Sequence, residues 1–122
     1  MSRIHGKDTQ PEKVVRKLLH QSGFRFRLHQ KDLPGNPDIV LPRYKAVIQV
    51  FGCFWHGHNC KDGRRPRSNK RYWNAKLDKN KRRDSINAQR LRRLGWRQAI
   101  VWECETRNLD LMKKRLTRLL RS

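Results

Sequence analysis

The residues with the most chemistry in this chain lie within nine positions, Gly52 to Cys60, which read GCFWHGHNC. Cys53, His58 and Cys60 follow one another in a C-x4-H-x-C spacing. Sulfur and imidazole are ligands that Zn²⁺ prefers. A tetrahedral zinc site needs a fourth ligand, and the only other cysteine is Cys104. Because three cysteines suit a Cys3His site better than a disulfide scheme with an odd thiol, we expect a structural zinc ion on Cys53, His58, Cys60 and Cys104.

His56 is left outside this ligand set, next to the aromatic residues Phe54 and Trp55. An imidazole beside exposed aromatics in a very basic chain predicts a catalytic role. An open alternative is that His56 is the fourth zinc ligand and Cys104 a core residue. Phe54 and Trp55 are either core residues or surface residues. Since successive residues of an extended chain point to opposite faces, we expect both to be buried only if the segment loops.

Charge is unevenly distributed along the chain. The sequence holds 31 Lys and Arg against 10 Asp and Glu, a net charge of +21. Residues 61–97 alone hold 15 basic and three acidic residues, a net of +12. Such a field repels itself unless a polyanion neutralises it, and ordinary solvated surfaces interleave both signs. We therefore expect a nucleic-acid partner; this stretch lacks the broad apolar face that would favour a membrane surface.

The length of 122 residues fits a single domain, residues 1–122. No run of about 18 apolar residues occurs, so we expect no membrane span. The N-terminal residues 1–7 lack the apolar region of a secretion signal, and cysteines in a ligand pattern suit a reducing compartment. We expect a monomer in the bacterial cytoplasm, associated with the nucleoid.

Apolar spacing predicts the element order α, β, β, β, α, β, α. Thr9 to Glu12 has the form of a capping box that begins the first helix, and Gly23 ends that helix. Alternation and apolar runs predict the later elements. These are strands at 24–28, 38–41, 46–50 and 96–102, and helices at 69–94 and 108–120. We expect an α/β fold, a mixed sheet flanked by helices.

A Pro-Asp pair ending at Asp38 precedes two strands joined by a hairpin, which is the arrangement of the PD-(D/E)xK restriction-endonuclease core. In such a core, Mg²⁺ polarises a phosphodiester and lowers the pKa of an attacking water. The acid and lysine positions of the motif fall near Gln49 and Phe51, and neither carries a charge. Because Mg²⁺ keeps several waters in most sites, Asp38, a backbone carbonyl such as that of Val50, phosphate oxygens and waters can still hold it. Glu12 either holds metal-bound water or only caps its helix.

Five spaced segments are more specific than any one motif. They are Pro34-Gly35-Asn36-Pro37-Asp38, Gly52-Cys53-Phe54-Trp55-His56, His58-x-Cys60, Arg83-Asp84 and Val101-Trp102-Glu103-Cys104. Together they resemble the very-short-patch repair (Vsr-type) DNA mismatch endonucleases, from about Thr9 to Cys104. The resemblance implies a PD-(D/E)xK-like core with a structural zinc. It also implies nicking of duplex DNA 5′ of the thymine in a T:G mismatch.

The resemblance implies roles for single residues. Asp38 matches the Mg²⁺-binding aspartate, helped by the Val50 carbonyl, and Glu12 matches a carboxylate that holds metal-bound water. His56 matches the catalytic histidine, and Asp84 the carboxylate that orients it. The family's zinc ligands match Cys53, His58, Cys60 and Cys104.

DNA contacts are implied in the same way. The aromatics that wedge into DNA match Phe54, Trp55 and Trp73, and the residues that read the mismatched pair match Lys76 and Asn80. Asn80 and Asp84 lie seven and eleven residues after Trp73, which places the three on one stripe of a helix.

Two departures from the family pattern bear on activity. Members often carry His or Asp at the position of Phe51, and the arm ahead of the first helix is short here. We expect weaker metal binding or a lower rate from the first, and a weaker hold on DNA from the second. Besides a mismatch nickase, the alternatives are a nickase with another target and a zinc-stabilised DNA-binding module that has lost catalysis. Retention of Asp38, His56 and Asp84 argues against the last.

Overall fold

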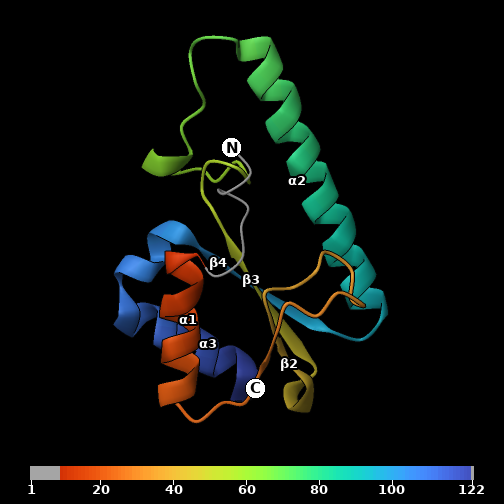
Figure 1. Ribbon diagram of the computed structural model, residues 1–122, viewed down its shortest axis with the longest axis vertical. Coiled ribbons are helices and arrows are strands. Elements are labelled where there is room, and N and C mark those ends of the chain that lie inside the picture. Colours follow the sequence, from red (N-terminus) through yellow and green to blue (C-terminus); the bar gives the residue numbers. More distant parts are fainter. Residues whose placement is uncertain (1–8, 122) are drawn as a thin grey trace.

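The computed structural model describes residues 9–121, which form a sheet with helices on both faces (Figure 1). The expectations for residues 1–7 and for the arm ahead of the first helix concern residues outside this range. The elements follow the predicted order. They are α1 (Gln10–Gln21), β1 (Arg27–Leu28), β2 (Ile39–Leu41), β3 (Ala46–Phe51), α2 (Lys70–Arg93), β4 (Arg97–Trp102) and α3 (Leu109–Arg121).

The sheet is mixed, as predicted, with the strand order β1-β2-β3-β4. The pairs β1–β2 and β2–β3 are antiparallel, whereas β3 and β4 are parallel. A 3-10 turn at Pro42–Tyr44 joins β2 to β3, with Lys45 in the left-handed region. Parallel strands require a crossover, which α2 supplies. The last register pair of the parallel ladder, Phe51 and Trp102, places the ends of both strands side by side.

The two faces of the sheet bury different helices because strand side chains alternate. On one face, α1 and α3 pack against the larger core cluster, which includes Val15, Ile48, Val101 and Leu116. On the other face, Leu91 near the end of α2 packs on Val40 and Val47. The opposite end of α2 extends past the sheet, beside the segment that follows β3 (Figure 1).

The local signals for α1 are confirmed. The Thr9 side chain accepts from the Glu12 N–H at 3.5 Å, and Gly23 takes a φ of +85° just after the helix. The first strand is shorter than predicted, because only Arg27 and Leu28 pair with β2. Leu109, expected on the buried side of the last helix, is 51% exposed at its first position. Within residues 9–121, every helix is too short or too polar to cross a bilayer.

Candidate active site and metal-binding cluster

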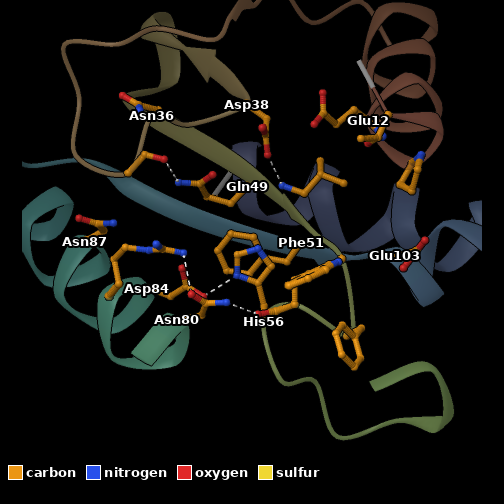
Figure 2. A pocket seen from close by; sticks show the side chains of 18 of the residues that line it. Glu12, Asn36, Asp38, Gln49, Phe51, His56, Asn80, Asp84, Asn87 and Glu103 are labelled. Carbon is orange, nitrogen blue, oxygen red and sulfur yellow. Dashed lines mark hydrogen bonds and ion pairs between the residues drawn. The ribbon is translucent and has the colours of Figure 1, made fainter. Parts of the chain in front are cut away.

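A cleft of about 1060 Å³ opens along the end of β3. It is lined by α1, by the turn before β2, by the segment after β3 and by α2 (Figure 2). All the expected functional residues outside the cysteine cluster line it, except Trp73. The cleft therefore brings together expected functional residues from positions 12 to 84 of the chain.

Asp38 sits at one end of the cleft, immediately before β2. Its Oδ2 accepts from the Val50 N–H at 2.7 Å. Burial raises the pKa of Asp38 to about 7, the Val50 hydrogen bond opposes this shift, and neighbouring Glu12 adds to it. When two carboxyl groups lie this close, it is unfavourable for both to be ionised at once. A bound cation would relieve that repulsion.

Glu12 and His29 complete a group with Asp38, in which one possible ligand atom from each residue lies within 4.8 Å of the others. Arg16, one turn after Glu12 on α1, donates to Glu12 Oε2 at 3.2 Å. The same guanidinium nitrogen lies 3.0 Å from His29 Nε2. Because an arginine only donates, that imidazole nitrogen accepts, and the neutral ring carries its proton on Nδ1.

His56 and Asp84 face each other across the other end of the cleft (Figure 2). His56 Nδ1 lies 2.6 Å from Asp84 Oδ2. A carboxylate only accepts, so Nδ1 carries the proton and, in the neutral ring, Nε2 carries the lone pair. The phenyl ring of Phe51 stacks on the imidazole with the centroids 3.8 Å apart. The turn after β3 and the middle of α2 thus assemble an oriented imidazole.

Asn80 lies on the same face of α2, one turn before Asp84, but it is buried rather than presented to solvent. Its Nδ2 donates to the Trp55 carbonyl at 3.0 Å, and its Oδ1 accepts from Arg83 at 3.2 Å. The side chain expected to read a base is therefore engaged with protein groups in this structure. Reading the mismatch with Asn80 would require those bonds to exchange.

The aromatic residues form one cluster. The Phe54 centroid lies 5.1 Å from Trp55 and 5.4 Å from Trp73, and Trp55 and Trp73 are 5.9 Å apart. The segment does turn after β3, so Trp55 is only 8% exposed. The ammonium of Lys76 lies 5.6 Å from the Trp55 ring centroid and 5.9 Å from that of Tyr72. The aromatic side chains that we expected to wedge into DNA are thus largely packed within the protein.

The four expected zinc ligands lie together, with one ligand atom of each of Cys53, His58, Cys60 and Cys104 within 4.8 Å of the others. Tight turns gather the first three, because the His58 N–H donates to the Cys53 carbonyl and the Cys60 N–H to the His58 carbonyl, both at 2.9 Å. Cys104 arrives just past β4, and its Sγ lies 3.6 Å from His58 Nδ1. His56 is not in this group, so the described geometry favours His58 as its imidazole.

Sequence comparison places the chain among known proteins. The sequence model of a family described as DNA mismatch endonuclease Vsr matches residues 1–62. The type II nicking enzyme V.XorIIP of Xanthomonas oryzae pv. oryzae (strain KACC10331 / KXO85) is 49% identical over 120 residues, 98% of this chain and 88% of the relative. The DNA mismatch endonuclease Vsr of Escherichia coli (strain K12) is 42% identical over 110 residues, 90% of this chain and 70% of the relative. The chain belongs to the Vsr family.

Family membership makes this chain a DNA endonuclease. A second similar protein carries the same kind of name as the first. The type II nicking enzyme V.NmeAIP of Neisseria meningitidis serogroup A / serotype 4A (strain DSM 15465 / Z2491) is 46% identical over 121 residues, 99% of this chain and 86% of the relative. Names of both kinds, mismatch endonuclease and type II nicking enzyme, thus occur among its relatives.

Several residues of this Vsr-family cleft were not singled out from sequence. They are His29, which lines the cleft, and two residues beside it: Arg16, which contacts His29, and Tyr72, which is 57% exposed beside the aromatic cluster. Tyr72 could have been found, because it precedes Trp73 and lies four residues before Lys76 on a helix. His29 had no local signal. Its place beside Asp38 depends on the pairing of β1 with β2.

Proposed function

We propose that this protein nicks duplex DNA at T:G mismatches, with Mg²⁺ at Asp38 and His56 as the general base. One observation carries the proposal. A single cleft holds Asp38 and a neighbouring carboxylate at one end and the hydrogen-bonded pair His56–Asp84 at the other (Figure 2). Phosphodiester hydrolysis needs both a site for a divalent cation and a base for the attacking water.

Oxygen ligands at the Asp38 end suit Mg²⁺. The N–H and C=O of a strand residue point toward the same neighbour. Because the Val50 N–H reaches Asp38, the Val50 carbonyl also faces that side of β3. We infer that Asp38 and Val50 hold the ion and that Glu12 holds its water. The antiparallel β2–β3 pair with Asp38 at its start supports a core of the PD-(D/E)xK type in one endonuclease domain.

The chemistry that Mg²⁺ supplies when bound is charge stabilisation at the phosphate and a lower pKa for a bound water. The protein's own share lies at His56. Nε2 accepts the proton of the attacking water, while Asp84 fixes the ring through Nδ1 and stabilises the imidazolium that forms. The stack on Phe51 keeps the ring plane fixed during that transfer.

Binding to DNA rests on charge and on the aromatic cluster. The net +12 of residues 61–97 attracts phosphates along α2 and the segment before it. We propose that Phe54, Trp55 and Trp73 open the base step at the mismatch, and that Lys76 and Asn80 contact the mispaired bases. Unstacking costs a few kcal/mol, less at a mismatch, which favours the damaged site.

The donor set of the cysteine cluster fits Zn²⁺, because three thiolates and one imidazole converge from two parts of the chain. We propose that Cys53, His58, Cys60 and Cys104 hold a structural zinc ion. That ion would tie the turn bearing His56 to the end of β4.

A second candidate function is nicking of DNA at another target. The relatives V.XorIIP and V.NmeAIP, named as type II nicking enzymes, favour it. Both candidates use the same cleft and differ only in how DNA is chosen.

One assay tests both candidates. Purified protein is incubated with otherwise identical T:G and T:A duplexes, with Mg²⁺ or with EDTA. We expect a single-strand nick at the T:G duplex with Mg²⁺ only, and nicking about 10²–10⁴-fold slower from His56→Ala. Equal nicking of both duplexes would favour the second candidate, and nicking unaffected by EDTA and by Asp38→Asn would overturn the metal site.

A further inference from the structure

His29 stands in the cleft without a role in the proposed function. Its ligand atom lies within 4.8 Å of those of both Glu12 and Asp38. Its backbone N–H donates to the Asp38 carbonyl at 3.1 Å, which extends the β1–β2 pairing by one residue. Its φ of +48° is in the left-handed region, which is unfavourable for a residue with a Cβ. The fold thus fixes this imidazole beside the two carboxylates.

The structure assigns His29 to the metal centre. We propose that Glu12, His29 and Asp38 together bind one divalent transition-metal ion, for which Mn²⁺ is the representative. The inference rests on the proposed function of the Asp38 end of the cleft and adds to it: Mg²⁺ would be held there by Asp38 and Val50 with Glu12 on its water, whereas a transition-metal ion would also take Glu12 and His29 as direct ligands. Three elements supply the donors, namely α1, the end of β1 and the turn before β2.

The donor types decide the class of ion. Mg²⁺ prefers an all-oxygen octahedral shell, whereas imidazole suits transition metals. Carboxylates suit Mg²⁺ and Mn²⁺ alike, and the added imidazole favours a transition-metal ion, so the three donors together match a transition metal better than Mg²⁺. Mn²⁺ serves as the probe because it accepts the carboxylates and is paramagnetic. Glu12 and His29 are only 5% and 18% exposed at their side chains, so a bound ion would exchange much of its water for protein ligands.

A positive group already occupies the place between these donors. The Arg16 guanidinium bridges Glu12 Oε2 and His29 Nε2, at 3.2 and 3.0 Å. Its N–H donates to the same imidazole lone pair that a metal ion would take. Arg16 is a long side chain, 17% exposed, one turn along α1. Metal binding therefore displaces Arg16 from Nε2.

Electron paramagnetic resonance of Mn²⁺ tests the assignment without relying on activity. The zinc-loaded protein is titrated with Mn²⁺, and nitrogen coupling to the bound ion is recorded by electron spin-echo modulation. We expect one Asp38-dependent site with ¹⁴N coupling. His29→Gln keeps an acceptor for Arg16 but should remove the coupling and weaken Mn²⁺ binding about tenfold or more. Mg²⁺ affinity, measured by displacement of Mn²⁺, should change much less.

Controls separate this inference from the proposed function. His20→Gln alters an exposed histidine of α1 and should leave coupling and affinity unchanged. Arg16→Met should tighten Mn²⁺ binding, and weaker binding would overturn the displacement of Arg16. Asp38-dependent binding without nitrogen coupling, unaffected by His29→Gln, would overturn the role of His29 and leave the proposed function standing. Loss of nicking in Asp38→Asn tests that function independently.

Discussion

The phenyl ring of Phe51 lies parallel to the imidazole of His56, with the ring centroids 3.8 Å apart and the planes 3° apart. Phe51 is itself fixed, because it is 7% exposed and makes an edge contact with Trp102, with the centroids 5.5 Å apart. Trp102 in turn stacks on His58, with the centroids 4.1 Å apart. The residue that departs from the family pattern thus positions the candidate base.

Replacing this ring should slow the reaction without weakening substrate binding. We expect Phe51→Leu to lower the single-turnover nicking rate by about 10–100-fold, because a misplaced base loses its alignment with the water. KM should change little, since Phe51 is 7% exposed and its ring is covered by His56. In the His56→Ala background, the same change should cost nothing further in rate. An equal loss in both backgrounds would mean that Phe51 acts through the fold.

Asp38 should make stability depend on pH. Its folded pKa is raised from 3.8 to about 7 by burial, with Glu12 adding and Arg16 opposing. The folded state therefore holds a proton that the unfolded state lacks between these values, so the contribution of Asp38 to stability falls as pH rises from about 4 to 7. Asp38→Asn does not titrate and still accepts from Val50. The stability of this variant relative to the parent should therefore rise between pH 5 and pH 8. The rise is on the order of 1.4 kcal/mol for each unit by which the pKa of Asp38 is raised within that range.

Thermal unfolding at both pH values, without added divalent cations, measures this difference. The surrounding groups Glu12 and Arg16 on α1, and His29 after β1, are common to parent and variant. Added Mn²⁺ at pH 8 should stabilise the parent more than the variant. A stability difference that is flat with pH would contradict the burial of Asp38.

Zinc content should distinguish the roles of His56 and His58, the two imidazoles of the turn after β3. Structural zinc contributes about 10–16 kcal/mol of apparent binding free energy. Cys60→Ala should therefore lose zinc and unfold or lose most of its stability. His56→Ala should keep one zinc per chain while its nicking rate falls by about 10²–10⁴. Elemental analysis of both variants decides the matter, and zinc lost from His56→Ala but kept by Cys104→Ala would reverse the ligand assignment.

The aromatic cluster should divide into packing and contact residues. Trp55 is 8% exposed, so Trp55→Ala should cost about 3–5 kcal/mol of stability as well as T:G over T:A discrimination. Tyr72 is 57% exposed, so Tyr72→Ala should leave stability within about 0.5 kcal/mol and weaken duplex binding. Denaturation and binding to both duplexes measure the two effects. If Trp55→Ala leaves stability unchanged, the ring is not the packing residue described above.

The sequence predicts most of the fold because its signals are local. The Thr9 cap, the apolar strand 46–50 and the turn-forming Gly23 each follow from a few neighbouring residues, and the structure has all three. The ligand cluster is recognisable from residue type, because Cys and His at that spacing have few other uses. The burial of Trp55 needed the direction of the chain after β3, which alternation cannot supply.

Other parts of the site depend on register. His29 reaches Asp38 only because Leu28 pairs with Ile39, which places the adjacent positions His29 and Asp38 opposite each other. The contact between Arg16 and His29 also requires α1 to pack on the face of the sheet that it shares with α3. No spacing within the chain encodes either relationship, since both are set by packing between distant segments.

The parallel pairing of β3 with β4 sets the order in which this protein acquires its two properties. Attraction to DNA resides in the charge of residues 61–97 and needs no folded structure. The cleft needs residues from positions 9 to 103 in place, and the ladder that ends at Phe51 and Trp102 closes a loop of about 50 residues, a kind of pairing that forms slowly. A chain in which β3 and β4 have not paired therefore keeps the charge that attracts DNA but lacks the assembled cleft. Cleavage requires that long-range strand pair.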